Sequence, residues 1–544
     1  MPTPQLLLGP VLRHVGETDA TVWVETDQAC TVEILGMREP TWTVAGHHYA
    51  LLVLTGLPAA ASIEYQVRLD EQLVWPLPGD HRPPPRIRTR DLQAPVRVAF
   101  GSCRYARSSA VENDPHFEPD ALMVLGQQLS RRREQEWPQA LLMLGDQVYA
   151  DETTEQTRAR IRRRRDITSG AGDQVADFEE YTWLYAESWT DPDVRWLMSV
   201  LPSSMIFDDH DVRDDWNTSR SWRQEMQATD WWQERIIGGL SSYWVYQHLG
   251  NLGPAELAAD ELFQQVRGAG VDVAPLLREF ARAADAEADG QKGQRWSYRR
   301  DFGPVRLLMI DSRCGRILDS GRRSMISDAE FDWLCQQVDG QYEHLLIGTS
   351  LPWLLPRALH DIEAWNEVLA DGARGRLVAR WSEKFRRAAD LEHWAAFGRS
   401  FTELAGLIRA AAAGRRGPAP ATICVLSGDV HHAYVSTAFT GEGLAAPVFQ
   451  LTCSPFHNFV PAAMKRAFRL AWSRVAERCT RVLLGAVHPV PEPGLAWRRT
   501  AGPYFGNELM TFVAAGRIAS VELAKTSPHR DELHVVDRVA LSTG

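Results

Sequence analysis

Short apolar runs that end in glycine or polar residues recur along most of the chain, and they constrain its fold more than any other feature. Six of them are Val96–Phe100, Leu141–Leu144, Met205–Phe207, Val305–Ile310, Leu345–Ile347 and Ile423–Leu426. Their length and their polar ends are typical of buried β-strands. Segments with helical spacing lie between them, as at Leu122, Leu125 and Leu129. Strands alternating with helices predict an α/β domain.

The last third of the chain is rich in predicted strands again. The runs are Val448–Thr452, Leu509–Val513, Ser520–Leu523 and His534–Val539. They predict a second sheet, or the second half of a two-sheet core.

The first 92 residues have a different pattern. Short alternating or β-branched runs, such as Thr21–Glu25 and Ile63–Leu69, are separated by turn residues at regular spacing, which is typical of an all-β sandwich. The proline run Pro83–Pro85 indicates a linker. We therefore expect an all-β domain over residues 1–92 and an α/β domain over residues 93–544.

The predicted sandwich resembles a fibronectin type III domain. The likeness rests on Ala20–Val24 and on Gly56–Pro58 followed by Tyr65–Val67. It implies that the hydroxyl of Tyr65 makes a corner-type hydrogen bond within the domain.

Composition excludes several classes of protein. The chain has 544 residues, a net charge of −11 and a pI near 5.8, so no overall basic field would recruit nucleic acid or an anionic membrane surface. No apolar run approaches the about 18 residues that span a bilayer, and the chain opens without a charged leader, so we expect a cytoplasmic protein. The seven cysteines are scattered without a C-x-x-C pair, which indicates neither a disulfide framework nor a zinc knuckle.

Four predicted strands end in residues that carry chemistry. The four segments are Gly101-Ser102-Cys103, Gly145-Asp146 with Tyr149, Asp208-Asp209-His210-Asp211, and Gly428-Asp429-Val430-His431-His432. Each has an ordinary explanation when taken alone: a buried thiol, a strand ending in a polar turn, a solvated acidic loop or helix cap, and a pair of loop histidines. If the strands share one sheet, however, their carboxyl ends meet at one place.

Such a set of carboxylates, phenol, thiol and imidazole would hold two metal ions, with Asp146 as the bridge. Two neighbouring cations polarise a phosphoryl group and lower the pKa of a bound water, which supplies hydroxide at neutral pH. An imidazole beside them can protonate the leaving alkoxide. The sequence therefore favours hydrolysis of a phosphate ester.

The same four segments resemble the calcineurin-like metallophosphoesterases, and among them the PhoD-like alkaline phosphatases. The resemblance covers about residues 93–540 and implies a two-sheet α/β/β/α sandwich, preceded by the β-sandwich domain. It implies Fe³⁺ bound by Cys103, Asp146 and Tyr149, and a second metal, Ca²⁺, bound by Asp209, with Asp429 and His431 completing the ligand shell. His210 would contact the phosphate and donate the proton to the leaving group.

One residue departs from the family pattern. Val148 stands where related proteins place a basic residue just before the tyrosine. Either Arg313 supplies the cation that holds the phosphate, or the binding of phosphate monoesters is weaker than in the secreted enzymes of the family. An alternative role for Arg313 is that of a structural partner of Asp311.

Two functional hypotheses follow. The first is a binuclear phosphatase or phosphodiesterase that hydrolyses mono- or diesters of small-molecule, lipid or nucleotide type by direct attack of a metal-bound hydroxide. The alternative is a non-catalytic, metal-braced binding protein whose β-sandwich docks a partner.

Overall fold

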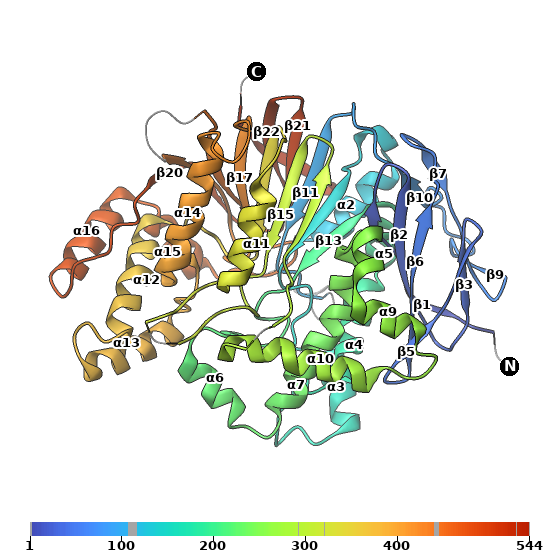
Figure 1. The fold of residues 1–544 in the computed structure, drawn as a ribbon, viewed down its shortest axis with the longest axis horizontal. Coiled ribbons are helices and arrows are strands. Elements are labelled where there is room, and N and C mark those ends of the chain that lie inside the picture. The colour runs from blue at the N-terminus through green and yellow to red at the C-terminus, as the bar shows by residue number, and fades with distance from the viewer. Residues whose placement is uncertain are drawn as a thin grey trace.

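Two mixed β-sheets face each other at the centre of the molecule in the computed structural model, which describes residues 3–106, 117–291, 293–319, 321–439, 445–528 and 530–542 (Figure 1). The six-stranded sheet has the order β13 (Ser203–Ile206), β12 (Ala140–Leu144), β11 (Val96–Gly101), β21 (Glu508–Ala515), β22 (Ile518–Ser527) and β23 (Arg530–Ala540). The seven-stranded sheet has the order β14 (Tyr298–Phe302), β15 (Val305–Ile310), β16 (His344–Thr349), β17 (Thr422–Ser427), β19 (Val448–Thr452), β18 (Ala433–Phe439) and β20 (Ala496–Tyr504). The predicted two-sheet α/β/β/α sandwich is confirmed.

Side chains on successive residues of a strand enter two different cores. In β15, Leu307 and Met309 pack between the two sheets, whereas Leu308 and Ile310 pack under the outer helices. Successive residues of a strand point to opposite faces, and here both faces are buried. This explains why the strands appear in the sequence as continuous apolar runs rather than as alternating ones.

Helices cover both outer faces of the sheet pair. On the six-stranded side, α2 (Ala121–Ser130) contacts β22 and β23 and packs on α5 (Pro192–Val200). On the seven-stranded side, α11 (Asp328–Val338) and α14 (Gly398–Ala412) contact β15 and β17. None of the helices in the described ranges is both long and apolar enough to cross a membrane.

The remaining helices lie in three insertions. Between β12 and β14 these are α3 (Glu155–Arg164), α4 (Phe178–Trp189), α6 (Arg220–Gln227), α7 (Trp232–Tyr243), α8 (Pro254–Ala259), α9 (Glu261–Gly268) and α10 (Ala274–Asp285). Between β16 and β17 these are α12 (Arg357–Ala370) and α13 (Arg376–Ala388), and after β19 come α15 (Ala462–Ala471) and α16 (Arg474–Gly485).

The N-terminal domain is a sandwich of antiparallel sheets. One sheet has the order β1 (Leu6–Val15), β2 (Asp19–Thr26), β6 (His47–Thr55) and β5 (Trp42–Val44), and the other has the order β4 (Met37–Pro40), β3 (Thr31–Ile34), β8 (Val67–Leu69) and β9 (Gln72–Trp75). Val22 and Val24 of β2 pack inside the sandwich, while Trp23 between them belongs to the core of the large domain. The small domain and the large domain therefore share one continuous core.

Two expectations for this domain were wrong in detail. The hydroxyl of Tyr65 donates to the carbonyl of Ser199 in α5 at 2.6 Å, so it joins the two domains instead of closing a corner within the sandwich. The proline run precedes one more strand, β10 (Arg86–Arg88), which pairs with β7 (Ser62–Glu64), so the chain has not yet left the sandwich there.

Candidate metal centre

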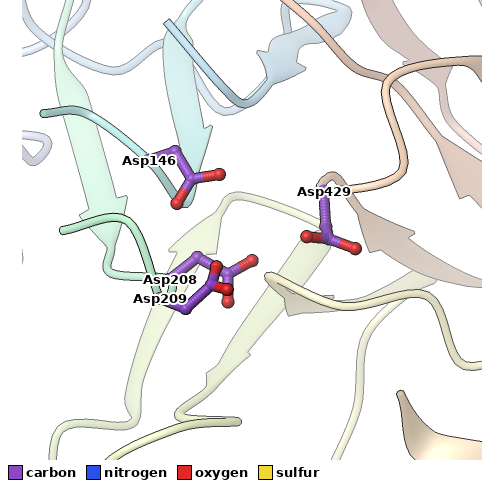
Figure 2. A group of neighbouring side chains, drawn as sticks. All are labelled: Asp146, Asp208, Asp209 and Asp429. Atoms are coloured by element: carbon purple, nitrogen blue, oxygen red, sulfur yellow. The ribbon is translucent and has the colours of Figure 1, made fainter. Parts of the chain in front are cut away.

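Four carboxylates from three loops converge between the two sheets. Asp146 follows β12, Asp208 and Asp209 follow β13, and Asp429 follows β17. One oxygen from each lies within 4.8 Å of one from each of the others, and Figure 2 shows the four side chains pointing toward a common centre. The strands do not share one sheet, which was the condition for this meeting in the sequence-based argument: β12 and β13 belong to one sheet and β17 to the other. The strand ends meet across the interface between the sheets.

Unusual backbone conformations present these side chains. Cys103, Asp146, Asp429 and His431 all have positive φ, between 48° and 67°, which is uncommon for residues other than glycine and clusters at functional sites. Gly145 precedes Asp146 at φ 105°, and a Cβ there would lie 2.6 Å from Cβ of Asp208. Glycine is therefore required for the first two acidic loops to approach each other.

Asp211 joins the loop after β12 to the loop after β13 through hydrogen bonds to their backbones. Its carboxylate accepts the backbone N–H of Asp146 and that of Asp208, each at 2.9 Å, and that of Val148 at 3.4 Å. Burial raises the pKa of Asp211 to about 7, although these hydrogen bonds oppose the shift. The fourth residue of the acidic segment is thus a structural support, not a member of the cluster.

The four carboxylates place an excess of negative charge in a largely buried site. Burial, followed by the charge of neighbouring carboxylates, raises the pKa of Asp146 far above its usual range, and burial with the charge of Asp209 does the same for Asp208. One oxygen each of Asp146 and Asp208 is buried without a hydrogen-bond partner. Buried anions that lack donors are stabilised by cations. The residues therefore fit a site for one or two metal ions.

The other predicted ligands lie at the edge of this cluster. The thiol of Cys103 is 3.1 Å from Oδ2 of Asp146. The amide of Asn458 donates to the hydroxyl of Tyr149 at 3.0 Å and lies 3.5 Å from Nε2 of His431. The structure thus brings together all six predicted metal ligands, and Asn458 joins two of them.

His210 lies beside this group. Its ring centre is 4.7 Å from that of Tyr149, and its Nδ1 is 2.9 Å from the carboxylate of Asp151. Burial lowers the pKa of His210, but the charge of Asp151 and of the acidic cluster outweighs it and raises the pKa well above the ordinary value. The carboxylate of Asp151 therefore favours the protonated imidazole and fixes one of its nitrogens.

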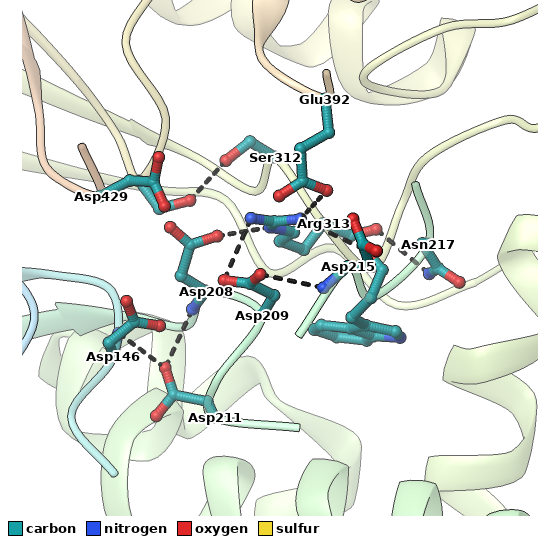
Figure 3. A network of polar contacts seen from close by, with 12 residues as sticks. Asp146, Asp208, Asp209, Asp211, Asp215, Asn217, Ser312, Arg313, Glu392 and Asp429 are labelled. Carbon is teal, nitrogen blue, oxygen red and sulfur yellow. Dashed lines mark hydrogen bonds and ion pairs between the residues drawn. The ribbon is translucent and has the colours of Figure 1, made fainter. Parts of the chain in front are cut away.

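Arg313 is buried among carboxylates, as Figure 3 shows. Its guanidinium pairs with Asp208, with Asp209 at 3.1 Å and with Glu392 at 2.5 Å, while its backbone N–H donates to Asp311 at 2.8 Å. The guanidinium is therefore not paired with Asp311, contrary to the structural alternative; its charge compensates acids of the cluster instead. Its predicted contact with phosphate stays a prediction.

The sequence analysis missed several residues of the site. His393 contacts Oδ2 of Asp429 through Nε2 at 2.9 Å and Glu363 through Nδ1 at 2.7 Å. Burial raises the pKa of Asp429, but the hydrogen bond and charge of His393 outweigh it and lower that pKa to about 2. His393 and Glu392 lie in an insertion after β16 and carry no motif that would single them out. Asp208, which adjoins a predicted ligand, could have been found from its place in the acidic segment.

Comparison with known proteins is consistent with this geometry. Residues 126–465 match the family of PhoD-like phosphatases, and residues 3–87 match a domain of unknown function (DUF7800). A search of curated proteins finds no match. Among solved structures, the fold is similar to one described as the structure of PhoD, with a TM-score of 0.57 and 10% identity, covering 99% of this chain and 90% of the other. A purple acid phosphatase, PPD1, from seeds of yellow lupin (Lupinus luteus) aligns with a TM-score of 0.49 and 12% identity over 99% of this chain and 74% of the other.

Proposed function

Because the chain belongs to the PhoD-like phosphatase family, and is therefore a metal-dependent phosphoric ester hydrolase, we propose that it hydrolyses phosphate mono- or diesters by direct attack of water, without a phospho-enzyme. The observation that carries the proposal is the group of four carboxylates within 4.8 Å of one another. Three of them are buried and Asp429 is partly buried, and two of the four have an oxygen without any donor. A pair of cations bound there would supply the charge that activates water and neutralises the phosphoryl oxygens.

The donor types support one assignment of the metals. Cys103, Asp146 and Tyr149 would hold Fe³⁺, since thiolate and phenolate suit a ferric ion. Asp209, Asp429 and His431 would hold the second metal, Ca²⁺, for which the carboxylate oxygens are suitable ligands. Asp208 lies between the two groups and is a further candidate ligand.

The chain's own residues have distinct roles around the reacting group. His210, fixed through Nδ1 by Asp151, would donate a proton from Nε2 to the leaving alkoxide. Arg313 would balance the charge of Asp208 and Asp209 and so keep the acidic loops in place. His393 would orient Asp429 by holding one of its oxygens.

The alternative, a metal-braced binding protein with the sandwich as docking module, has less support. The sheet that contains β1, β2, β6 and β5 packs against the large domain, so that face of the sandwich is covered. The predicted cytoplasmic location and the choice between monoesters and diesters stay predictions.

The purified protein should hydrolyse p-nitrophenyl phosphate or its bis-ester, and removal of metal by a chelator should abolish the activity. His210→Ala should lower turnover by about 10²-fold or more while the bound metal is retained. Unchanged turnover in this variant would remove His210 from the proposed role. The control is His81→Ala, an exposed histidine of the N-terminal domain.

The metal assignment has its own test. Metal analysis should find iron, and phenolate and thiolate bound to Fe³⁺ should give a charge-transfer band in the visible spectrum. Cys103→Ser and Tyr149→Phe should each shift or remove that band. A colourless, iron-free, active enzyme would contradict the ligand assignment and leave the reaction class intact.

A further inference from the structure

Helix α13 presents apolar side chains to solvent. Leu377, Trp381 and Phe385 are spaced four residues apart, so they form one stripe along the helix. Leu377 and Trp381 are 74% and 73% exposed, and Phe385 is 44% exposed. The residues on the buried side are Ser382 and Arg386. This is the reverse of an ordinary surface helix, in which the apolar stripe faces the core.

Polar contacts fix α13 in this orientation. The carbonyl of Ser382 accepts the side-chain amide of Asn366 in α12 at 2.9 Å. Glu383 pairs with Arg386 at 2.9 Å and accepts the hydroxyls of Ser219 and Ser221 at the start of α6. Rotation of the helix to bury its apolar stripe would break the contacts with Asn366, Ser219 and Ser221, whereas the Glu383–Arg386 pair lies within α13 itself. The stripe therefore stays exposed unless another surface covers it.

The hairpin of α15 and α16 has the same character. Neither helix contains a buried residue, and Leu470, Val482 and Leu483 are 63%, 72% and 70% exposed. Both helices and α13 contact α12, and the four lie together at the left of Figure 1. The side chain of Arg374, just before α13, also donates to the carbonyl of Val487, just after α16. The three helices α13, α15 and α16 thus form one group, here called the apolar-basic helices.

Basic residues flank these apolar ones. Residues 376–388 contain five Lys or Arg and one Glu, and residues 462–485 contain six Lys or Arg and one Glu. The net charge of the whole chain is −11, so the positive charge is a local concentration. The ammonium group of Lys384 lies over the ring of Trp381, 5.5 Å from its centre. Leu, Phe and Trp flanked by Lys and Arg are typical of helices that lie in the surface of an anionic membrane.

We propose that the apolar-basic helices dock this protein onto a membrane surface that contains anionic lipids. The apolar side chains would enter the boundary between headgroups and acyl chains, and the Lys and Arg side chains would contact lipid phosphates. Nucleic acid would leave the apolar stripe uncovered. A two-fold pair of this chain would set the basic flanks of both copies against each other. The net charge of the chain did not predict this attraction, because the positive charge of these helices is local.

Docking through these helices would bring the metal centre close to the membrane. A cavity of about 770 Å³ has α13 as one wall and extends to Asp215, whose backbone N–H donates to Asp209 at 3.1 Å. On the other side, Phe468 of α15 packs on His432 with ring centres 4.4 Å apart, next to the predicted ligand His431. The substrate this implies is a phosphate ester exposed at a membrane surface. That implication rests on the proposed function, whereas the docking does not.

Vesicle sedimentation tests the docking without any turnover. The full-length protein should bind vesicles of phosphatidylcholine with about 30 mol % phosphatidylglycerol at least about tenfold more tightly than vesicles of phosphatidylcholine alone, and added salt should weaken the binding. Replacing Leu377, Trp381 and Phe385 together by Ser should lower the affinity for anionic vesicles by about tenfold or more. These side chains are exposed, and an unchanged thermal unfolding curve would verify that the variant folds.

Two further variants test whether vesicle binding depends on the apolar-basic helices. Val271→Ser, which removes an apolar side chain that is 71% exposed in the connection between α9 and α10, should bind vesicles like the unaltered protein. Replacing Arg376, Arg380 and Lys384 together by Gln should remove the preference for anionic vesicles. Absence of vesicle binding, or equal binding by the triple Ser variant, would overturn the proposal. So would a dimer in solution that the triple Ser variant dissociates and that binds no vesicles, because the stripe would then be an interface between two copies.

Discussion

Imidazole–carboxylate contacts recur around the metal centre. His210 is held by Asp151, and His393 is held between Glu363 and Asp429. In each case a carboxylate fixes one ring nitrogen and stabilises the positive charge of the ring. The difference lies in the other nitrogen, which in His393 contacts a carboxylate of the cluster. We therefore propose that His393 is a positioning residue and that His210 is the imidazole that acts on the substrate.

Asp151→Asn should lower kcat by roughly 10- to 100-fold and leave KM close to that of the unaltered enzyme. Among the described residues, the carboxylate of Asp151 hydrogen-bonds to His210 and to the backbone N–H of Asp214, so we expect its effect on the chemical step to pass through the imidazole. Steady-state kinetics with p-nitrophenyl phosphate measure both constants. Asp173→Asn, which removes an exposed carboxylate paired with Arg158, is the control. A rise in KM at unchanged kcat would show that Asp151 acts on substrate binding and not through His210.

At the scale of secondary-structure elements, the site depends on how strand ends are tied to one another. The backbone N–H of Cys103 donates to the carbonyl of Gly145 at 3.1 Å, which links the ends of β11 and β12. Asp211 links the ends of β12 and β13. The hydroxyl of Ser102 accepts the backbone N–H of Asp429 at 3.1 Å, which links the first sheet to the second. Each strand end is thus positioned by hydrogen bonds to its neighbours.

Asp211→Asn should weaken metal binding by about tenfold although Asp211 lies outside the cluster. Asparagine keeps one acceptor oxygen but places an NH₂ group against backbone N–H donors, so the loops after β12 and β13 can no longer share one carboxylate. Competition with a metal chelator measures the affinity. Asp166→Asn, at an exposed loop, is the control. Unaltered metal affinity in Asp211→Asn would show that the loops keep their positions without this support.

The strands were predictable from sequence because burial on both faces leaves continuous apolar runs, and β19 matches its predicted range, Val448–Thr452, residue for residue. Their assignment to sheets was not predictable. An apolar run indicates that a strand is buried, but it does not indicate which strand lies beside it in the sheet. The ends of β12 and β17 were correctly expected to meet, although they come from different sheets.

Local sequence also does not indicate which distant segments meet in space, and this explains which site residues were not predicted. Asp146 and Asp209 follow apolar strands, and that context marks them in the sequence. Glu392, His393 and Asn458 reach the site from long connections, where polar residues are ordinary. Nothing in their local sequence separates them from solvated loop residues. Only the three-dimensional path of these connections brings them to the cluster.

At the scale of the whole molecule, the N-terminal sandwich is held to the large domain by buried polar contacts as well as by shared apolar packing. Arg13 of β1 is almost fully buried and donates to the carbonyls of Tyr246 and Gln247 at 2.9 and 2.6 Å. Trp23 packs against Tyr246 with ring centres 5.2 Å apart. The two domains should therefore unfold together.

Arg13→Met should lower the free energy of unfolding by roughly 2–4 kcal/mol, because two carbonyl oxygens would stay buried without donors. Urea denaturation followed by circular dichroism measures the change, and calorimetry should show one transition for the unaltered protein. Arg38→Met, which replaces a half-exposed arginine of the same domain, should change the stability little. Two separate transitions in the unaltered protein would contradict the shared core.

Two buried histidines should make the whole molecule sensitive to acid. Burial lowers the pKa of His248 and of His360 to about 3 from an ordinary value of 6.5, so both are neutral in the folded protein. Below pH 6.5 the unfolded chain binds protons that the folded chain excludes, and stability falls by about 1.4 kcal/mol per pH unit for each histidine until the pH nears 3. His360 lies between Phe401 and Trp497, each 4.8 Å away between ring centres, so phenylalanine can take its place. The free energy of unfolding of His360→Phe should therefore fall less than that of the unaltered protein between about pH 6.5 and 4.5. Urea denaturation at several pH values measures this fall. An equal fall in both proteins would show that His360 titrates normally in the fold.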